Sequence, residues 1–129
     1  MASNPDSCAK ENALWMELHE WFVSNAKDKE ADVLFIGGDH IALLGQSQFY
    51  LEHLEPLHCL CFGSFGDTIH NLLWRIERGE VENFTPKVIV VSIGQSDMNI
   101  EAENFLTILN KIAELLKQKQ PMLKFSFCT

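Results

Sequence analysis

Val33-Leu34-Phe35-Ile36-Gly37-Gly38-Asp39-His40 is a run of four apolar residues that ends abruptly in two glycines. Such near-continuous hydrophobicity predicts a strand that is covered on both faces, as in parallel sheets. The pattern recurs at Val88–Ile93, where β-branched residues dominate before Gly94, and more weakly at His58–Phe62 before Gly63. Glycine follows all three predicted strands.

Helical spacing of apolar residues predicts helices between these strands. The expected helices are Cys8–Asn25, one or two short helices within Ile41–Leu54, a helix from Asp67 or Thr68 (as N-cap) to near Gly79, and Ala102–Lys119. A last strand, Leu123–Cys128, follows Pro121. This alternation predicts a three-layer α/β/α fold with a flavodoxin-like parallel sheet of about four strands. Its functional crevice should lie at the carboxyl ends of the strands.

The chain has 129 residues, which suits one domain, and we expect a flexible tail over residues 1–7 and a domain over 8–129. A net charge of −8 without clustered Lys or Arg argues against nucleic-acid binding. The apolar runs are too short for a membrane span. The first seven residues do not resemble a secretory signal, so we expect a cytoplasmic protein.

The cysteines and histidines show no metal-ligand spacing, so we expect no metal or other cofactor. The four cysteines, Cys8, Cys59, Cys61 and Cys128, are interpreted as free thiols. A dinucleotide-binding fold is disfavoured because GxGxxG is missing after the first strand.

Aromatic and acidic residues suggest further assignments. Trp15 and Trp21 fall at helical spacing and are interpreted as core. Trp74 either packs in the core or lies on an exposed helix face that contacts another subunit. Glu77, Glu80 and Glu82 are interpreted as a solvated face.

Several segments together carry a family resemblance. They are Asp32–Gly37, Leu54–His58, Gly66-Asp67-Thr68, Leu73-Trp74-Arg75 and Pro86–Val91. From about Trp15 to Lys124 the chain resembles the catalytic subunits of intracellular platelet-activating factor acetylhydrolase Ib, which are GDSL or SGNH hydrolases. The resemblance implies the SGNH hydrolase fold, with residues 8–129 forming a partial domain that stops after about four strands.

The family motifs place the catalytic positions. The Gly-Asp-Ser motif aligns with Gly37-Gly38-Asp39, so the resemblance implies that Asp39 replaces the nucleophilic serine. It also implies oxyanion-hole positions at Gly66 and at Ser96, where the family has asparagine. The family's Asp-x-x-His block, which supplies the general base, would fall beyond residue 129.

Ester hydrolysis of this kind needs an activated hydroxyl and donors aimed at the developing oxyanion. The sequence therefore predicts a catalytically inactive relative that acts by subunit association. The partners implied by the resemblance are a homo- or heterodimer with family catalytic subunits, or the WD-repeat lissencephaly protein. The alternative is a residual or altered acetyl-ester hydrolase that uses Asp39 and acts on platelet-activating-factor-like lipids.

Overall fold

A computed structural model describes residues 13–27, 31–82, 86–97, 100–119 and 124–128, with the side chains of 119 and 124–128 left out. The expected tail over residues 1–7, Cys8 and the Cys128 side chain lie outside this description. Within it, four strands form one parallel sheet in the order β2-β1-β3-β4. The strands are β1 (Val33–Gly37), β2 (Cys59–Gly63), β3 (Val88–Ser92) and β4 (Lys124–Cys128). The predicted α/β fold with a parallel sheet is confirmed.

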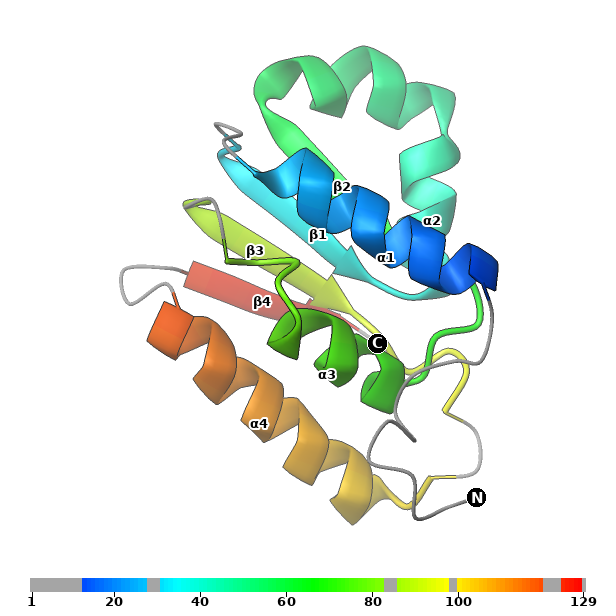
Figure 1. Ribbon diagram of the computed structural model, residues 1–129, viewed down its shortest axis with the longest axis vertical. Helices are drawn as coiled ribbons and strands as arrows, with labels where there is room; N and C mark the ends of the chain where they lie inside the picture. The colour runs from blue at the N-terminus through cyan, green and yellow to red at the C-terminus, as the bar shows by residue number, and fades with distance from the viewer. Residues whose placement is uncertain (1–12, 28–30, 83–85, 98–99, 120–123, 129) are drawn as a thin grey trace.

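The helices connect and cover these strands. They are α1 (Ala13–Ala26), α2 (Asp39–Gln46), α3 (Ile69–Glu77) and α4 (Ala102–Lys119). The segment predicted as one or two short helices forms α2, a π-helical turn η1 (Tyr50–Leu54) and a 3-10 turn η2 (Glu55–Leu57). Figure 1 shows α2, η1 and η2 as an arc beside β2, while α1 crosses in front of β1 and β2.

Alternate residues of the central strands form the core. Leu34 and Ile36 of β1 and Ile89 and Val91 of β3 are fully buried. Helices α3 and α4 pack on them through buried apolar side chains, which include Leu72, Ile76, Ile112 and Leu116. The intervening side chains, Val33, Phe35, Val88 and Val90, are half-buried, so the described residues cover the other face of these strands only in part.

Two sequence interpretations are wrong, and one open choice is decided. Trp21 was expected in the core but is 58% exposed, because the buried stripe of α1 runs through Trp15, His19 and Phe22 instead. Glu80 was expected in solvent but is 0% exposed, because it pairs with a buried arginine. Trp74 is 6% exposed, so it packs rather than forming an open face.

Helix α3 begins with a side-chain cap. Thr68, not Asp67, is the N-cap: its hydroxyl accepts from the Asn71 amide at 3.3 Å, and Asn71 Oδ1 accepts from the Thr68 amide at 2.9 Å. This reciprocal capping box satisfies two amides that the helix leaves unpaired. It also fixes where the chain turns after β2.

Replacing Thr68 with alanine removes this cap, so we expect the free energy of unfolding to fall by about 1 kcal/mol. Thr107→Ala is the matched control, because Thr107 is exposed on α4, its hydroxyl donates to the Glu103 carbonyl of the same helix, and alanine favours a helix. Urea denaturation followed by circular dichroism measures both. Equal stability of the Thr68→Ala protein and the parent would contradict the capping role.

Candidate functional site

The carboxyl ends of β1, β2 and β3 meet at one edge of the sheet, as the sequence predicted. Here the Gly38 amide donates to the Ser92 carbonyl at 3.0 Å, and the Ser64 amide donates to the Gly37 carbonyl at 3.2 Å. A Cβ atom at Gly37 would lie 1.8 Å from the Ser92 oxygen. Only glycine permits this approach, so Gly37 allows the loop after β1 to lie against the end of β3.

Asp39 is the first residue of α2 and is half-buried. Its Oδ1 accepts a hydrogen bond from the Gly66 amide at 2.6 Å, across 27 residues of sequence. A bond this short to a carboxylate is typical of charge-assisted contacts. Gly66 has φ of +78°, which glycine adopts without a steric penalty. The structure thus brings Asp39 and Gly66, two predicted site residues, into direct contact.

Ser96, the third predicted site residue, is half-buried in the turn closed by the Asp97 amide and the Gly94 carbonyl at 3.2 Å. The described contacts do not join it to Asp39 or Gly66. Its neighbour Asp97 instead accepts from the Ile69 amide at 3.0 and 3.1 Å and so holds the start of α3. Burial raises the pKa of Asp97 above its ordinary value, although the bond from Ile69 opposes this.

Gln95, in the loop after β3, lies close to Gly38 in the loop after β1. Both polar atoms of its amide are buried without a hydrogen-bond partner, and its Oε1 lies 3.5 Å from where a Cβ at Gly38 would be. A larger side chain at Gly38 would therefore meet Gln95, Ile93 and the Asp67 backbone. No sequence pattern singles out Gln95, because its position matters only through the close approach of the loops after β1 and β3.

Below these loops lies a buried ionic cluster that the sequence interpretation missed. Arg75 is 1% exposed and pairs with Glu80 at 2.9 Å and with Asp67 at 3.0 Å. Glu80 also lies 2.6 Å from His19 Nδ1, and Asp67 Oδ1 accepts from the Trp15 indole at 2.9 Å. The detectable signal is Arg75 itself, which falls within the apolar run Leu72–Ile76.

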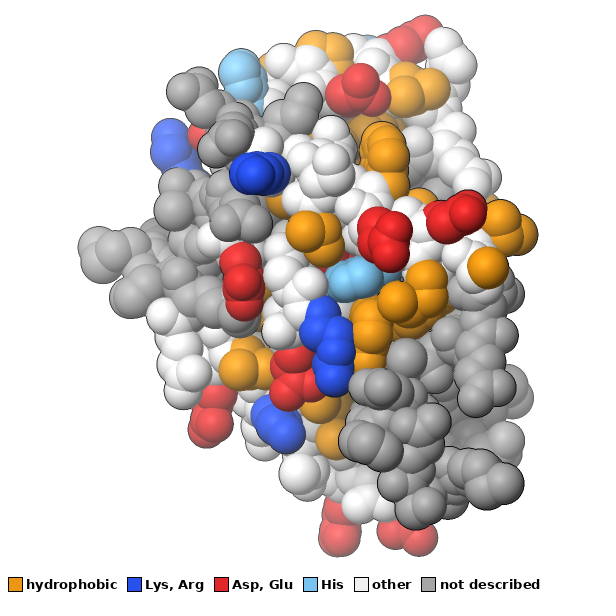
Figure 2. All heavy atoms as spheres, in the orientation of Figure 1, with side chains coloured by type: hydrophobic (Ala, Val, Ile, Leu, Met, Phe, Trp, Pro, Cys, Tyr) orange, Lys and Arg blue, Asp and Glu red, His pale blue; other side chains and the backbone are white. Residues whose placement is uncertain are grey.

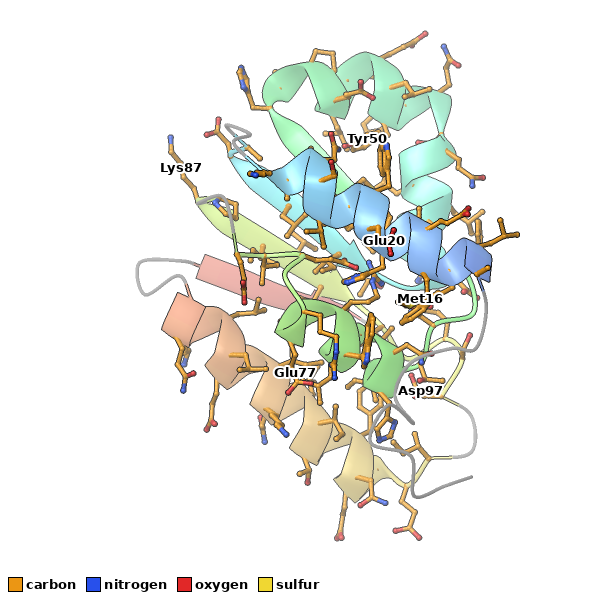
Figure 3. The ribbon with its side chains drawn as sticks, in the orientation of Figure 1. Met16, Glu20, Tyr50, Glu77, Lys87 and Asp97 are labelled. Atoms are coloured by element: carbon orange, nitrogen blue, oxygen red, sulfur yellow. The ribbon has the colours of Figure 1, made fainter. Side chains whose placement is uncertain are left out.

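The same guanidinium fixes the ends of two strands. It donates to the Gly37 carbonyl at 3.1 Å and to the Phe62 carbonyl at 2.7 Å. Burial alone would lower the pKa of Arg75, but the carboxylates of Glu80 and Asp67 outweigh it, so the pKa is raised. Figure 3 shows Asp97 beside the start of α3 and Glu77 at the other end of that helix.

The arrangement offers a carboxylate already bonded to a backbone amide. Among the described residues no group of three His, Cys, Asp or Glu side chains could hold a metal ion. His40 is exposed and His70 half-buried, while His19 is committed to Glu80. No helix in the described part of the chain is long and apolar enough to cross a membrane.

Curated relatives share much of this sequence. Human platelet-activating factor acetylhydrolase IB subunit alpha2 is 43% identical over 110 residues, which cover 85% of this chain and 48% of that protein. The human alpha1 subunit is 40% identical over 107 residues, covering 83% of this chain and 46% of that subunit. The chain thus spans about half the length of the curated relatives it matches. No family model matches the sequence.

Solved structures share the fold. A GDSL-like lipase from Bacteroides thetaiotaomicron aligns with a TM-score of 0.69, covering 84% of this chain and 56% of that one. The sequence identity is 16%, so this likeness concerns the fold alone.

Removing Glu80 should show how much the ionic cluster contributes to the free energy of unfolding. Glu80→Ala leaves Arg75 buried with one carboxylate instead of two, so we expect a loss of about 3–5 kcal/mol in the free energy of unfolding. Glu77→Ala is the control, since its ion pair with Arg78 is exposed and should cost less than about 1 kcal/mol. Similar small losses in both, measured by urea denaturation, would contradict the structural role of Glu80.

Proposed function

The chain belongs to the family of the platelet-activating factor acetylhydrolase IB alpha subunits, and on that premise we propose that it is a non-catalytic member that acts by associating with another subunit. In this proposal Asp39 stands where the family has its nucleophilic serine. Gly66 and Ser96 stand at the two oxyanion-hole positions. The proposal depends on Asp39 and does not depend on where the chain ends.

The observation that carries the proposal is the 2.6 Å bond from the Gly66 amide to Asp39. An oxyanion hole works because its donors point at the oxygen that becomes negative in the transition state. Here the amide proposed for that task already binds a side-chain oxygen of the protein. An ester carbonyl could take this amide only by displacing Asp39.

The charge of Asp39 also opposes ester hydrolysis. A carboxylate at this position would repel the negative oxygen that develops on the substrate. Attack by the carboxylate itself would give a mixed anhydride rather than the usual acyl-serine. Removing one oxyanion donor alone typically lowers kcat by about a hundred- to a thousand-fold, so several such changes leave little family-type activity.

Subunit association is supported by exposed apolar side chains on one continuous segment. Leu43 of α2, Phe49, Leu51 of η1 and Leu57 of η2 are 49–63% exposed. All four belong to the arc beside β2 (Figure 1). Burying large apolar side chains drives most protein association, and the relatives are themselves named as subunits. We therefore place the proposed interface on this arc, with a family subunit as partner.

Two finer parts of the proposal follow from kinship with these subunits. The first is that the chain works in the cytoplasm. The second is that the WD-repeat lissencephaly protein is a further partner to test beside the catalytic subunits. Neither depends on the Asp39 contact, so each needs its own measurement.

The 129-residue chain should not hydrolyse a short-chain acetyl ester above the uncatalysed rate, because Asp39 occupies the Gly66 amide. Asp39→Asn should behave identically in a spectrophotometric assay with p-nitrophenyl acetate. A human alpha2 subunit serves as the positive control. Turnover by the parent chain that Asp39→Asn abolishes would overturn the proposal and establish Asp39 as a reacting group.

Association should be weakened by placing charge on the arc. We expect Leu51→Glu with Leu57→Glu to raise the Kd for a family subunit by at least about tenfold, as for truncation of central interface residues. Leu106→Glu is the matched control, because Leu106 is similarly exposed (55%) but lies on α4. Sedimentation velocity with the alpha2 subunit measures the complex. Absence of any complex, or equal weakening by the control, would contradict the interface.

A further inference from the structure

A cavity of about 650 Å³ opens between α1, the arc and edge strand β2. This volume falls within the range of about 300–1,000 Å³ that is usual for small-molecule pockets. Asp39, Gly66 and Ser96 do not line it, so it is separate from the candidate site. In Figure 3, Tyr50 lies on the inner side of the arc, which places this residue at the cavity.

The cavity walls are mainly apolar. Leu18, Trp21 and Phe22 of α1 form one wall, and Ile41 of α2 and Phe65 of the loop after β2 contribute to the others. Trp21 is 58% and Phe65 is 49% exposed, so both rings lose solvent contact if the cavity is filled. Burying such aromatic surface is favourable. Figure 2 shows apolar side chains reaching the surface between charged ones on the side that carries α1.

Two buried polar groups of the cavity are already satisfied by the protein, while the lining also includes the polar side chains of Asn25, Gln46, Glu55 and His58. The Tyr50 hydroxyl donates to the Cys59 carbonyl at 3.1 Å, and the Cys61 thiol donates to the Ile41 carbonyl at 3.1 Å. Burial raises the pKa of Cys61 to about 12 and also raises that of Tyr50, so both groups stay neutral. A ligand can therefore fill this space without having to supply hydrogen bonds to them.

The charge of the lining selects the kind of ligand. Among the described residues, the lining includes the carboxylate of Glu55 and the imidazole of His58 but no lysine or arginine, and the whole chain carries a net charge of −8. An anionic head group would find no lysine or arginine among these lining residues to pair with. The cavity follows β2, whose five residues span roughly 13 Å at about 3.3 Å per residue, so an elongated ligand suits it better than a compact one.

We propose that this cavity binds one straight alkyl chain of an amphiphile with an uncharged head group. The chain lies along β2 between α1 and the arc, with Trp21 and Phe65 closing over it. The head group remains at the solvent-exposed opening. This site does not include the Asp39–Gly66 contact, and it shares the arc with the proposed subunit interface but not the exposed side chains on which that interface rests.

Binding of n-decyl maltoside to the full chain, below the concentration at which this detergent forms micelles, tests the proposal by isothermal titration calorimetry. We expect saturable one-to-one binding. Because each buried methylene contributes about 0.8 kcal/mol, n-octyl maltoside should bind more weakly by up to about fourfold per methylene removed. Decanoate should bind more weakly than decyl maltoside. Affinity that is independent of chain length, or equal affinity for decanoate, would overturn the proposal.

Two variants of lining residues and one control test whether the ligand binds in this cavity. Phe65→Ser should raise the Kd about five- to tenfold, and Gln46→Trp should reduce binding by adding bulk at an exposed lining position. Phe49→Ser is the matched control, because Phe49 is 59% exposed but does not line the cavity. Circular dichroism establishes that each variant is folded. Unchanged binding in both lining variants would overturn the proposal, as would self-association that buries Trp21 and excludes the detergent.

Discussion

The buried pairing of Arg75 with Glu80 and Asp67 is the interaction on which the rest of the structure depends. One guanidinium connects α3 to the carbonyls that end β1 and β2, and its carboxylate partners connect it to α1 through His19 and Trp15. A buried charge is stable only when its partners and hydrogen bonds are complete. The cluster therefore restrains four segments at once, α1, α3, β1 and β2, and makes their relative positions interdependent.

This restraint explains why the loops at the strand ends come so close. Arg75 donates to the Gly37 carbonyl, which also accepts from the Ser64 amide after β2, and the Gly38 amide donates to Ser92 at the end of β3. Asp39 follows Gly37 by two residues, and Gly66 precedes Asp67, which itself binds Arg75. The short contact between Asp39 and Gly66 is thus set by backbone that is fixed on both sides.

Much of the fold was predictable because local sequence signals agreed with the final structure. Strands β1 and β3 are continuous apolar runs that end in or just before glycine, and such runs are typical of parallel sheets. The errors at Trp21 and Glu80 have another origin. Their burial is decided by partners far away in sequence: Glu80 is 61 residues from His19, and the side of α1 that packs inward carries Trp15, His19 and Phe22 and leaves Trp21 exposed. Periodicity within one helix contains no such information.

The proposed non-catalytic role rests on a contact that is compatible with the fold of a hydrolase. In a hydrolase of this fold the loop amide must remain available for the transition state, which leaves a polar group waiting for a ligand. When the protein's own carboxylate binds that amide, as Asp39 binds Gly66, the polar group is satisfied and the loop is held without substrate. Replacing catalytic groups commonly stabilises a fold at the expense of activity. If Gly66 stands at the oxyanion-hole position, as we propose, the Asp39–Gly66 contact keeps the loop in place while it occupies the donor that catalysis would require.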